Sequence, residues 1–151
     1  MLSATWAGPD PFFRRLFESR KATLEIQGVE AYARASILAL APPKWVSEND
    51  AAITEQQRVQ LAAAAPVAVQ ASRIDAIVRF DQRARLGAIR CPTLVIVAQD
   101  DMVTPKFYSD ELAAKIPGAK LVVLEYGGHF APVIAPEPYN AAVGAFLRAQ
   151  R

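Results

Sequence analysis

Between about residue 10 and residue 89 the apolar residues recur every three or four positions, which predicts short amphipathic helices. Asp10 followed by Pro11 is typical of a helix start, and Gly28 is expected to end that helix. The phenylalanines Phe12, Phe13 and Phe17 are interpreted as one buried face rather than as substrate contacts. The helices expected after Gly28 span about 29–40, about 47–65 and the residues that follow Pro66.

From about residue 91 the pattern changes to strand, helix, strand, helix. Residues 93–98 and 120–124 are continuous aliphatic runs, as expected for parallel strands that are covered on both faces. Thr104-Pro105 is expected to cap the helix between them, and Pro136 to open the last helix. This alternation predicts βαβ crossovers and an α/β sheet.

The first residues resemble the end of a strand whose beginning is missing. We therefore divide the chain into a strand end and loop (1–9), a helical cap with its connection (10–89) and an α/β core segment (90–151). Two and a half strands make a poor independent core, because they leave an open sheet edge. The predicted fold class is accordingly a partial α/β fold, the later portion of a larger domain.

Composition narrows the class of protein. The chain is 52% hydrophobic and 21% charged, which favours a globular core, and its net charge of +2 is spread over helix faces rather than gathered in a nucleic-acid patch. One cysteine and one histidine exclude an internal disulfide and make a zinc site implausible; no metal or cofactor is expected. The apolar run at 61–69 contains Pro66 and is too short for a bilayer, and no signal peptide is visible. We expect a cytoplasmic protein without membrane contact.

An acid and a histidine each follow a predicted strand. Asp100 and Asp101 come after the first strand, and His129, the only histidine, comes after the second and behind two glycines. Since ligands meet open α/β sheets at the carboxyl ends of the strands, we expect a carboxylate and the imidazole to meet there. Such a pair moves protons near neutral pH. Asp101 is favoured as the partner, with Asp100 bonding to loop amides; the reverse assignment stays open.

A nucleophile is missing from the pattern. A strained elbow needs glycine on both sides of the attacking serine, and no serine here has that context. The six serines are residues 3, 19, 36, 47, 72 and 109. Cys91 precedes its strand and so lies far from the carboxyl ends; we interpret it as a buried structural cysteine.

The segment from Leu86 to Pro105 resembles the acid-bearing strand and loop of α/β-hydrolase-fold enzymes. Gly127-Gly128-His129-Phe130 resembles their histidine loop, and 136–140 the start of their last helix. Thr5-Trp6, the residues 14–20 and the stretch to Trp45 are similar to the aminoacrylate or carbamate hydrolases of pyrimidine breakdown and to 3-oxoadipate enol-lactone hydrolases.

The resemblance implies roles for particular residues. It implies that Asp101 is the catalytic acid and His129 the general base, while the nucleophile and oxyanion-hole residues match nothing here and should lie upstream of Met1. Residues 10–89 would be the cap over the site. Trp6, Phe130 and Val133 are the candidate substrate-pocket residues.

Two functions are compatible with these observations. In the first, the chain is the cap and acid–base half of a serine hydrolase that acts on a small ester, lactone or carbamate. Its partner would be a complementing N-terminal half. In the second, it is a non-catalytic remnant that binds a ligand or associates with itself through the exposed sheet edge.

Overall fold

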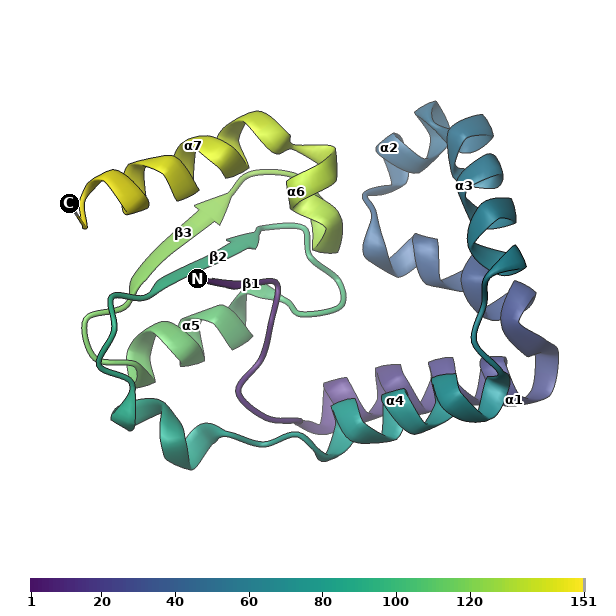
Figure 1. Ribbon diagram of the computed structural model, residues 1–151, viewed down its shortest axis with the longest axis horizontal. Helices are drawn as coiled ribbons and strands as arrows, with labels where there is room; N and C mark the ends of the chain where they lie inside the picture. The colour runs from purple at the N-terminus through teal and green to yellow at the C-terminus, as the bar shows by residue number, and fades with distance from the viewer. Residues whose placement is uncertain (151) are drawn as a thin grey trace.

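The computed structural model describes residues 1–150 and shows a helical part beside a small sheet that is flanked by helices (Figure 1). The strands are β1 (Leu2–Ser3), β2 (Leu94–Ala98) and β3 (Lys120–Leu124). The helices and 3-10 turns are α1 (Pro11–Leu40), α2 (Pro43–Glu48), α3 (Asp50–Ala62), α4 (Val67–Arg79), η1 (Arg83–Ala88), α5 (Lys106–Lys115), η2 (Gly128–Phe130), α6 (Ala131–Ile134) and α7 (Pro136–Arg148).

The three strands are parallel and lie in the order β1-β2-β3. β2 and β3 pair along five residues, from Leu94 opposite Lys120 to Ala98 opposite Leu124. All five residues of β2 are buried, which explains why this strand reads as a continuous aliphatic run. β3 is buried only at Leu124 and forms one edge of the sheet within residues 1–150. The strands expected from the sequence are confirmed within one residue at their ends.

Helices cover both faces of the sheet (Figure 1). Val95 points to the face where Leu112 of α5 packs, whereas its neighbour Ile96 points to the face where Tyr139 of α7 packs. Successive residues of a strand alternate between faces, so β2 supplies apolar side chains to two separate layers. The result is an α/β sheet with its carboxyl ends directed toward the helical part.

In the helical part, α1 and α4 run side by side and bury an aromatic and aliphatic core (Figure 1). The side chain of Asp10 caps α1 by accepting a hydrogen bond of 2.8 Å from the Phe13 amide. The predicted end at Gly28 corresponds to a break inside α1, where Gly28 adopts φ of 87° and redirects the chain. The buried residues of this core include Phe13, Phe17, Leu24, Ala71 and Ile74.

Three local expectations are wrong. Phe12 is 41% exposed, because the buried stripe formed by Phe13 and Phe17 lies one residue further along the helix. Cys91 is exposed, because it lies in the bend before β2 that neither helical layer covers. The helix expected over about 47–65 begins only at Asp50, as α3. The residues before it form the unexpected helix α2, because its first residue, Pro43, is well suited to open a helix.

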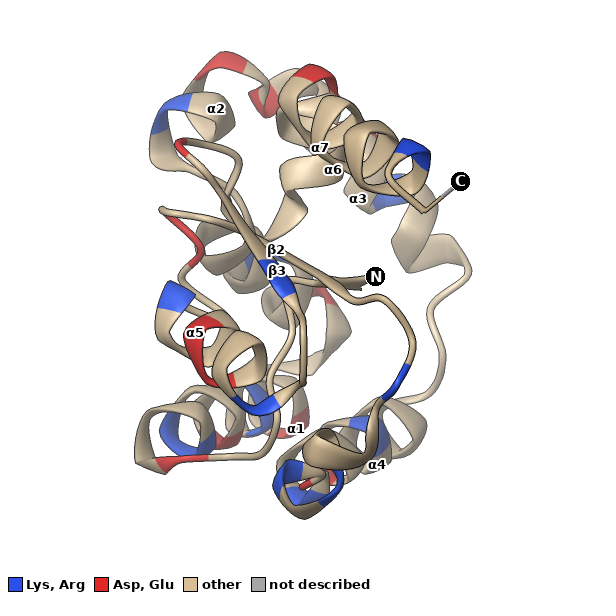
Figure 2. Ribbon diagram, turned by 90° about the vertical axis from the view of Figure 1, so that its left-hand side faces the viewer, with Lys and Arg blue, Asp and Glu red and all other residues tan. Residues whose placement is uncertain are grey.

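Lysine and arginine alternate with acidic residues along α1, α4 and α5 (Figure 2). Several of these charges form pairs four residues apart on one helix, such as Lys106 with Asp110. Within residues 1–150, no single helix has both the length and the hydrophobicity of a membrane span; only α3 and α4 taken together, bent by 107°, reach them.

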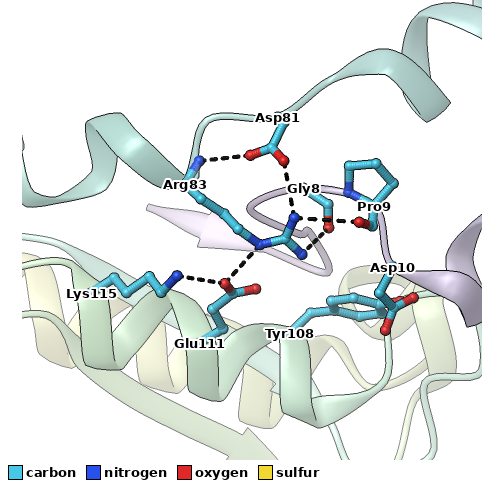
Figure 3. Close-up of polar contacts among 8 residues, drawn as sticks. All are labelled: Gly8, Pro9, Asp10, Asp81, Arg83, Tyr108, Glu111 and Lys115. Carbon is cyan, nitrogen blue, oxygen red and sulfur yellow. Dashed lines mark hydrogen bonds and ion pairs between the residues drawn. The ribbon is translucent and has the colours of Figure 1, made fainter.

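Arg83 ties the loop between β1 and α1 to the rest of the sheet layer (Figure 3). Its Nη2 donates to the Gly8 carbonyl at 2.7 Å and its Nη1 to the Pro9 carbonyl at 3.3 Å. Its Nε donates to Glu111 of α5 at 2.8 Å, and Asp81 accepts a further bond from Nη1 at 3.0 Å. One guanidinium thus joins three segments that are far apart in the sequence.

We expect Arg83→Met to lower the free energy of unfolding by about 1.5–3 kcal/mol, because two backbone carbonyls and Glu111 lose a charged donor. Arg85→Met, in the same 3-10 turn but with a bond only to Gln82, is the control and should change little. Urea denaturation measures both variants. Equal losses for the two would contradict the assigned role of Arg83.

Candidate active site

The carboxyl ends of β2 and β3 bring two loops together. Asp101 follows β2 through a turn in which its amide donates to the Ala98 carbonyl at 3.2 Å. His129 follows β3 and lies in η2. Because β2 and β3 are adjacent and parallel, the two loops emerge at the same edge of the sheet.

The Asp101 carboxylate is the centre of the hydrogen-bonding network. Asp101 is 3% exposed, and its Oδ1 accepts hydrogen bonds from the Val103 and Thr104 amides, both at 2.8 Å. Oδ2 accepts from the Thr104 hydroxyl at 2.9 Å. Nδ1 of His129 lies 3.1 Å from Oδ2 and 3.3 Å from Oδ1. The structure therefore brings the two predicted catalytic residues into contact; their catalytic role stays a prediction.

Electrostatics favour an ionised Asp101. Burial by itself raises the pKa of this carboxyl, but the hydrogen bond and charge of His129 and the bonds from Thr104 outweigh burial and hold the pKa below its usual value. An ionised carboxylate at Nδ1 selects the tautomer in which Nδ1 carries the proton. Nε2 is then the basic nitrogen. Within residues 1–150 it has no hydrogen-bond partner, and the His129 side chain is 21% exposed.

Asp100 contacts the backbone of the histidine loop rather than the ring of His129. Its Oδ1 accepts from the Gly128 amide at 2.8 Å and its Oδ2 from the Gly127 amide at 3.4 Å. The expectation that Asp100 bonds to loop amides is confirmed. One carboxylate thus holds the backbone of the histidine loop, and the adjacent carboxylate of Asp101 contacts the ring.

Two glycines shape the histidine loop. Gly127 and Gly128 have φ of 137° and 58°, which side-chain-bearing residues rarely adopt. A Cβ on Gly127 would lie 2.8 Å from Cα of Ala131, and a Cβ on Gly128 would lie 2.9 Å from the Leu40 carbonyl oxygen. The loop is therefore packed tightly between α6 and the end of α1.

Thr104 is the site residue that the sequence did not reveal. It was expected to cap α5, yet α5 begins after Pro105 without a side-chain cap. Thr104 is fully buried instead, with its hydroxyl 2.9 Å from Asp101 and 3.3 Å from Nδ1 of His129. Its position three residues after Asp101 was the available signal, since short polar side chains often bond across such a turn.

The candidate pocket residues lie in different surroundings. Phe130 lines a pocket of about 440 Å³ that the helical part forms. Trp6 packs in the helical core, with its ring 4.8 Å from that of Phe13, and Val133 is 71% exposed. Neither Trp6 nor Val133 lines that pocket, and a substrate contact remains a prediction for all three. Within residues 1–150, no group of three or more His, Cys, Asp or Glu residues is arranged to hold a metal ion.

A family model and a curated relative both match most of this chain. A sequence model described as "Alpha/beta hydrolase family" matches residues 2–142. The chain is 38% identical over 141 residues to the "Putative carbamate hydrolase RutD" of Azorhizobium caulinodans, a match that covers 93% of this chain and 53% of the relative. The chain therefore spans about half the length of this relative.

Solved structures agree on the fold. A hydrolase from Pseudomonas aeruginosa PA01 is 30% identical with a TM-score of 0.81, and the match covers 97% of this chain and 54% of that one. The enol-lactonase from Burkholderia xenovorans LB400 has a TM-score of 0.84 at 22% identity, with the same coverage of 97% and 54%. The second likeness concerns the fold alone.

The lowered pKa of Asp101 predicts a pH dependence of stability. A carboxyl whose pKa is lower in the folded chain stabilises the fold above its unfolded pKa of about 4, and this contribution is lost as the pH falls through the folded pKa. Asp101→Asn should therefore be less stable than the parent at pH 7, with the difference shrinking below about pH 4. Urea denaturation at pH values from about 2.5 to about 7 measures this difference in stability. Glu18→Gln, at an exposed position of α1, is the control. A difference independent of pH would contradict the assignment.

Gly128→Ala should lower the free energy of unfolding by about 1–3 kcal/mol, because a side chain would be strained at positive φ and would meet the Leu40 carbonyl. Gly87→Ala is the matched control, since a Cβ there meets nothing within 4 Å. Thermal and urea unfolding of the two variants give the comparison. If Gly128→Ala were as stable as Gly87→Ala, the tight packing of the histidine loop would be refuted.

Proposed function

The chain belongs to the alpha/beta hydrolase family, and from this membership we propose that it supplies the acid and base for a serine hydrolase. The proposed substrate is a small ester, lactone or carbamate. The observation that carries the proposal is the contact of Asp101 with Nδ1 of His129 at the carboxyl ends of adjacent strands. This arrangement leaves Nε2 of His129 as the proton acceptor.

In the proposed reaction, a serine hydroxyl attacks the substrate carbonyl while Nε2 of His129 takes its proton. The buried carboxylate of Asp101 stabilises the imidazolium that forms, and the imidazolium then gives the proton to the leaving group. A water molecule, deprotonated by the same nitrogen, hydrolyses the acyl-enzyme. Asp100 and Thr104 act as positioning residues, because they hold the histidine loop and the Asp101 carboxylate.

We place the nucleophile and the oxyanion-hole donors in a segment outside these 151 residues. No serine of the chain lies in a Gly-x-Ser-x-Gly context, and the fold's usual order of serine, acid, histidine puts such an elbow before Asp101 in the chain. The match to about half of the Azorhizobium relative supports this division of the site. The name of that relative supports a carbamate among the three substrate classes.

A second candidate function is self-association or ligand binding without catalysis. β1 contributes only two paired residues to β2, and β3 has no outer neighbour among residues 1–150. Unpaired strand edges favour pairing with another chain. Light scattering on the purified chain separates a self-associating module from a monomer.

The hydrolase proposal is tested with a chimera in which this chain replaces the matching half of the Azorhizobium relative. We expect the chimera to hydrolyse p-nitrophenyl acetate and the 151-residue chain alone to be inactive, because the latter lacks an activated serine. His129→Ala should reduce kcat of the chimera by about 10²- to 10⁴-fold, the usual contribution of a positioned general base.

Lys44→Gln, at an exposed position of α2, is the control and should leave kcat unchanged. Unchanged turnover in the folded His129→Ala chimera would reject the role of the histidine. Turnover by the isolated chain at the rate of the chimera would reject a nucleophile from outside the 151 residues.

A further inference from the structure

A pocket of about 440 Å³ lies among α1, α3 and α4, with Phe130 of the histidine loop in its wall. This volume suits a small organic molecule. Leu40, whose carbonyl approaches Gly128, also lines it. The ring of Phe130 is 6.3 Å from that of His129, so the pocket is next to the candidate catalytic pair.

All the charged side chains that line this pocket are basic. Its charged lining residues are Arg20 and Arg73, and no aspartate or glutamate lines it. Within residues 1–150, neither Arg20 nor Arg73 forms an ion pair. A partly buried cation without a counter-ion favours the binding of an anion, because burial of an uncompensated charge is unfavourable.

The guanidinium of Arg20 is held in place by neutral groups. Its Nη2 donates to the Tyr32 hydroxyl and to Ser36 Oγ, both at 3.1 Å. Its Cζ lies 5.4 Å from the centre of the Phe17 ring and 5.3 Å from that of Tyr32. These cation–π contacts orient the group without neutralising it.

Donors remain unused around this guanidinium. Nε of Arg20 is buried and has no hydrogen-bond partner among residues 1–150. The Tyr32 hydroxyl accepts from Arg20 but donates to no acceptor in the part of the chain that the structure describes. A carboxylate offers acceptors for such donors, and Arg pairs with carboxylates in a planar, two-bond geometry.

We propose that this pocket binds a carboxylate group of the ligand, with Arg20 as the anion-binding residue. That the ligand is the substrate rests on the proposed function; the substrate is then a small ester, lactone or carbamate that carries a carboxylate besides its reacting carbonyl. Arg20 holds the carboxylate in the pocket, and the reacting carbonyl lies toward Phe130 and His129.

The test uses the 151-residue chain and measures binding rather than turnover. Monomethyl succinate, which has one carboxylate and one ester, is titrated against ¹⁵N-labelled protein and compared with dimethyl succinate, which has no charge. We expect the arginine Nε–H resonance of Arg20 to shift with monomethyl succinate and to stay in place with dimethyl succinate. This comparison requires no variant.

Substitutions give the second arm of the test. Arg20→Met should weaken binding of monomethyl succinate about 10- to 100-fold, since a charge-assisted hydrogen bond is lost. Arg20→Lys should retain part of it, and Arg14→Met, on an exposed position of the same helix, should bind as the parent does. Circular dichroism reports whether each variant is folded.

Equal binding of the two succinate esters, or parent-like binding by folded Arg20→Met, would overturn the inference. The two proposals fail separately. An active chimera together with a chain that does not discriminate the esters rejects only the carboxylate site. Charge-dependent binding together with an inactive chimera rejects only the hydrolase function.

Discussion

The buried carboxylate of Asp101 is the constraint on which the site depends. A carboxylate that is 3% exposed is unfavourable unless hydrogen bonds compensate the loss of water. Here the compensation comes from the Val103 and Thr104 amides, the Thr104 hydroxyl and the ring of His129. The last of these donors belongs to another loop. Satisfying the carboxylate therefore also positions the imidazole, and the stability of the turn after β2 is coupled to the placement of the ring.

The histidine loop connects the sheet to the helical part. Asp100 accepts from the amides of Gly127 and Gly128, which attaches the loop to the end of β2. On its other side Gly128 approaches the Leu40 carbonyl at the end of α1, closer than any side chain would allow. A change in the position of α1 would therefore be transmitted to His129. The pocket that contains Arg20 is built largely on the same helix, so this pocket and the ring of His129 share one support.

Sequence patterns predicted the parts of this structure that depend on local regularity or on topology. The aliphatic runs predicted β2 and β3, and the parallel arrangement then required Asp101 and His129 to emerge at one edge. Features that depend on tertiary packing were not predictable in this way. The exposure of Cys91 follows from where the helical layers end, and the bonding of Thr104 follows from the exact path of a loop. Arg20 gave no such signal, because its contacts with Tyr32 and Ser36 arise only where the chain turns at the break in α1 at Gly28.

The contact between Asp101 and His129 is assembled from segments of this chain alone. Each hydrogen bond to Asp101 comes from residues 103–129, and the loop that carries His129 is held by Asp100 and by α1 of the same chain. The segment from β2 through η2 is one strand–helix–strand crossover with a short turn at its end, whose geometry is set by the parallel pairing of two strands. The imidazole is therefore already oriented by contacts within this chain. Nε2 is the ring nitrogen that remains free, because Nδ1 faces Asp101 and Thr104 whereas Nε2 has no hydrogen-bond partner among residues 1–150.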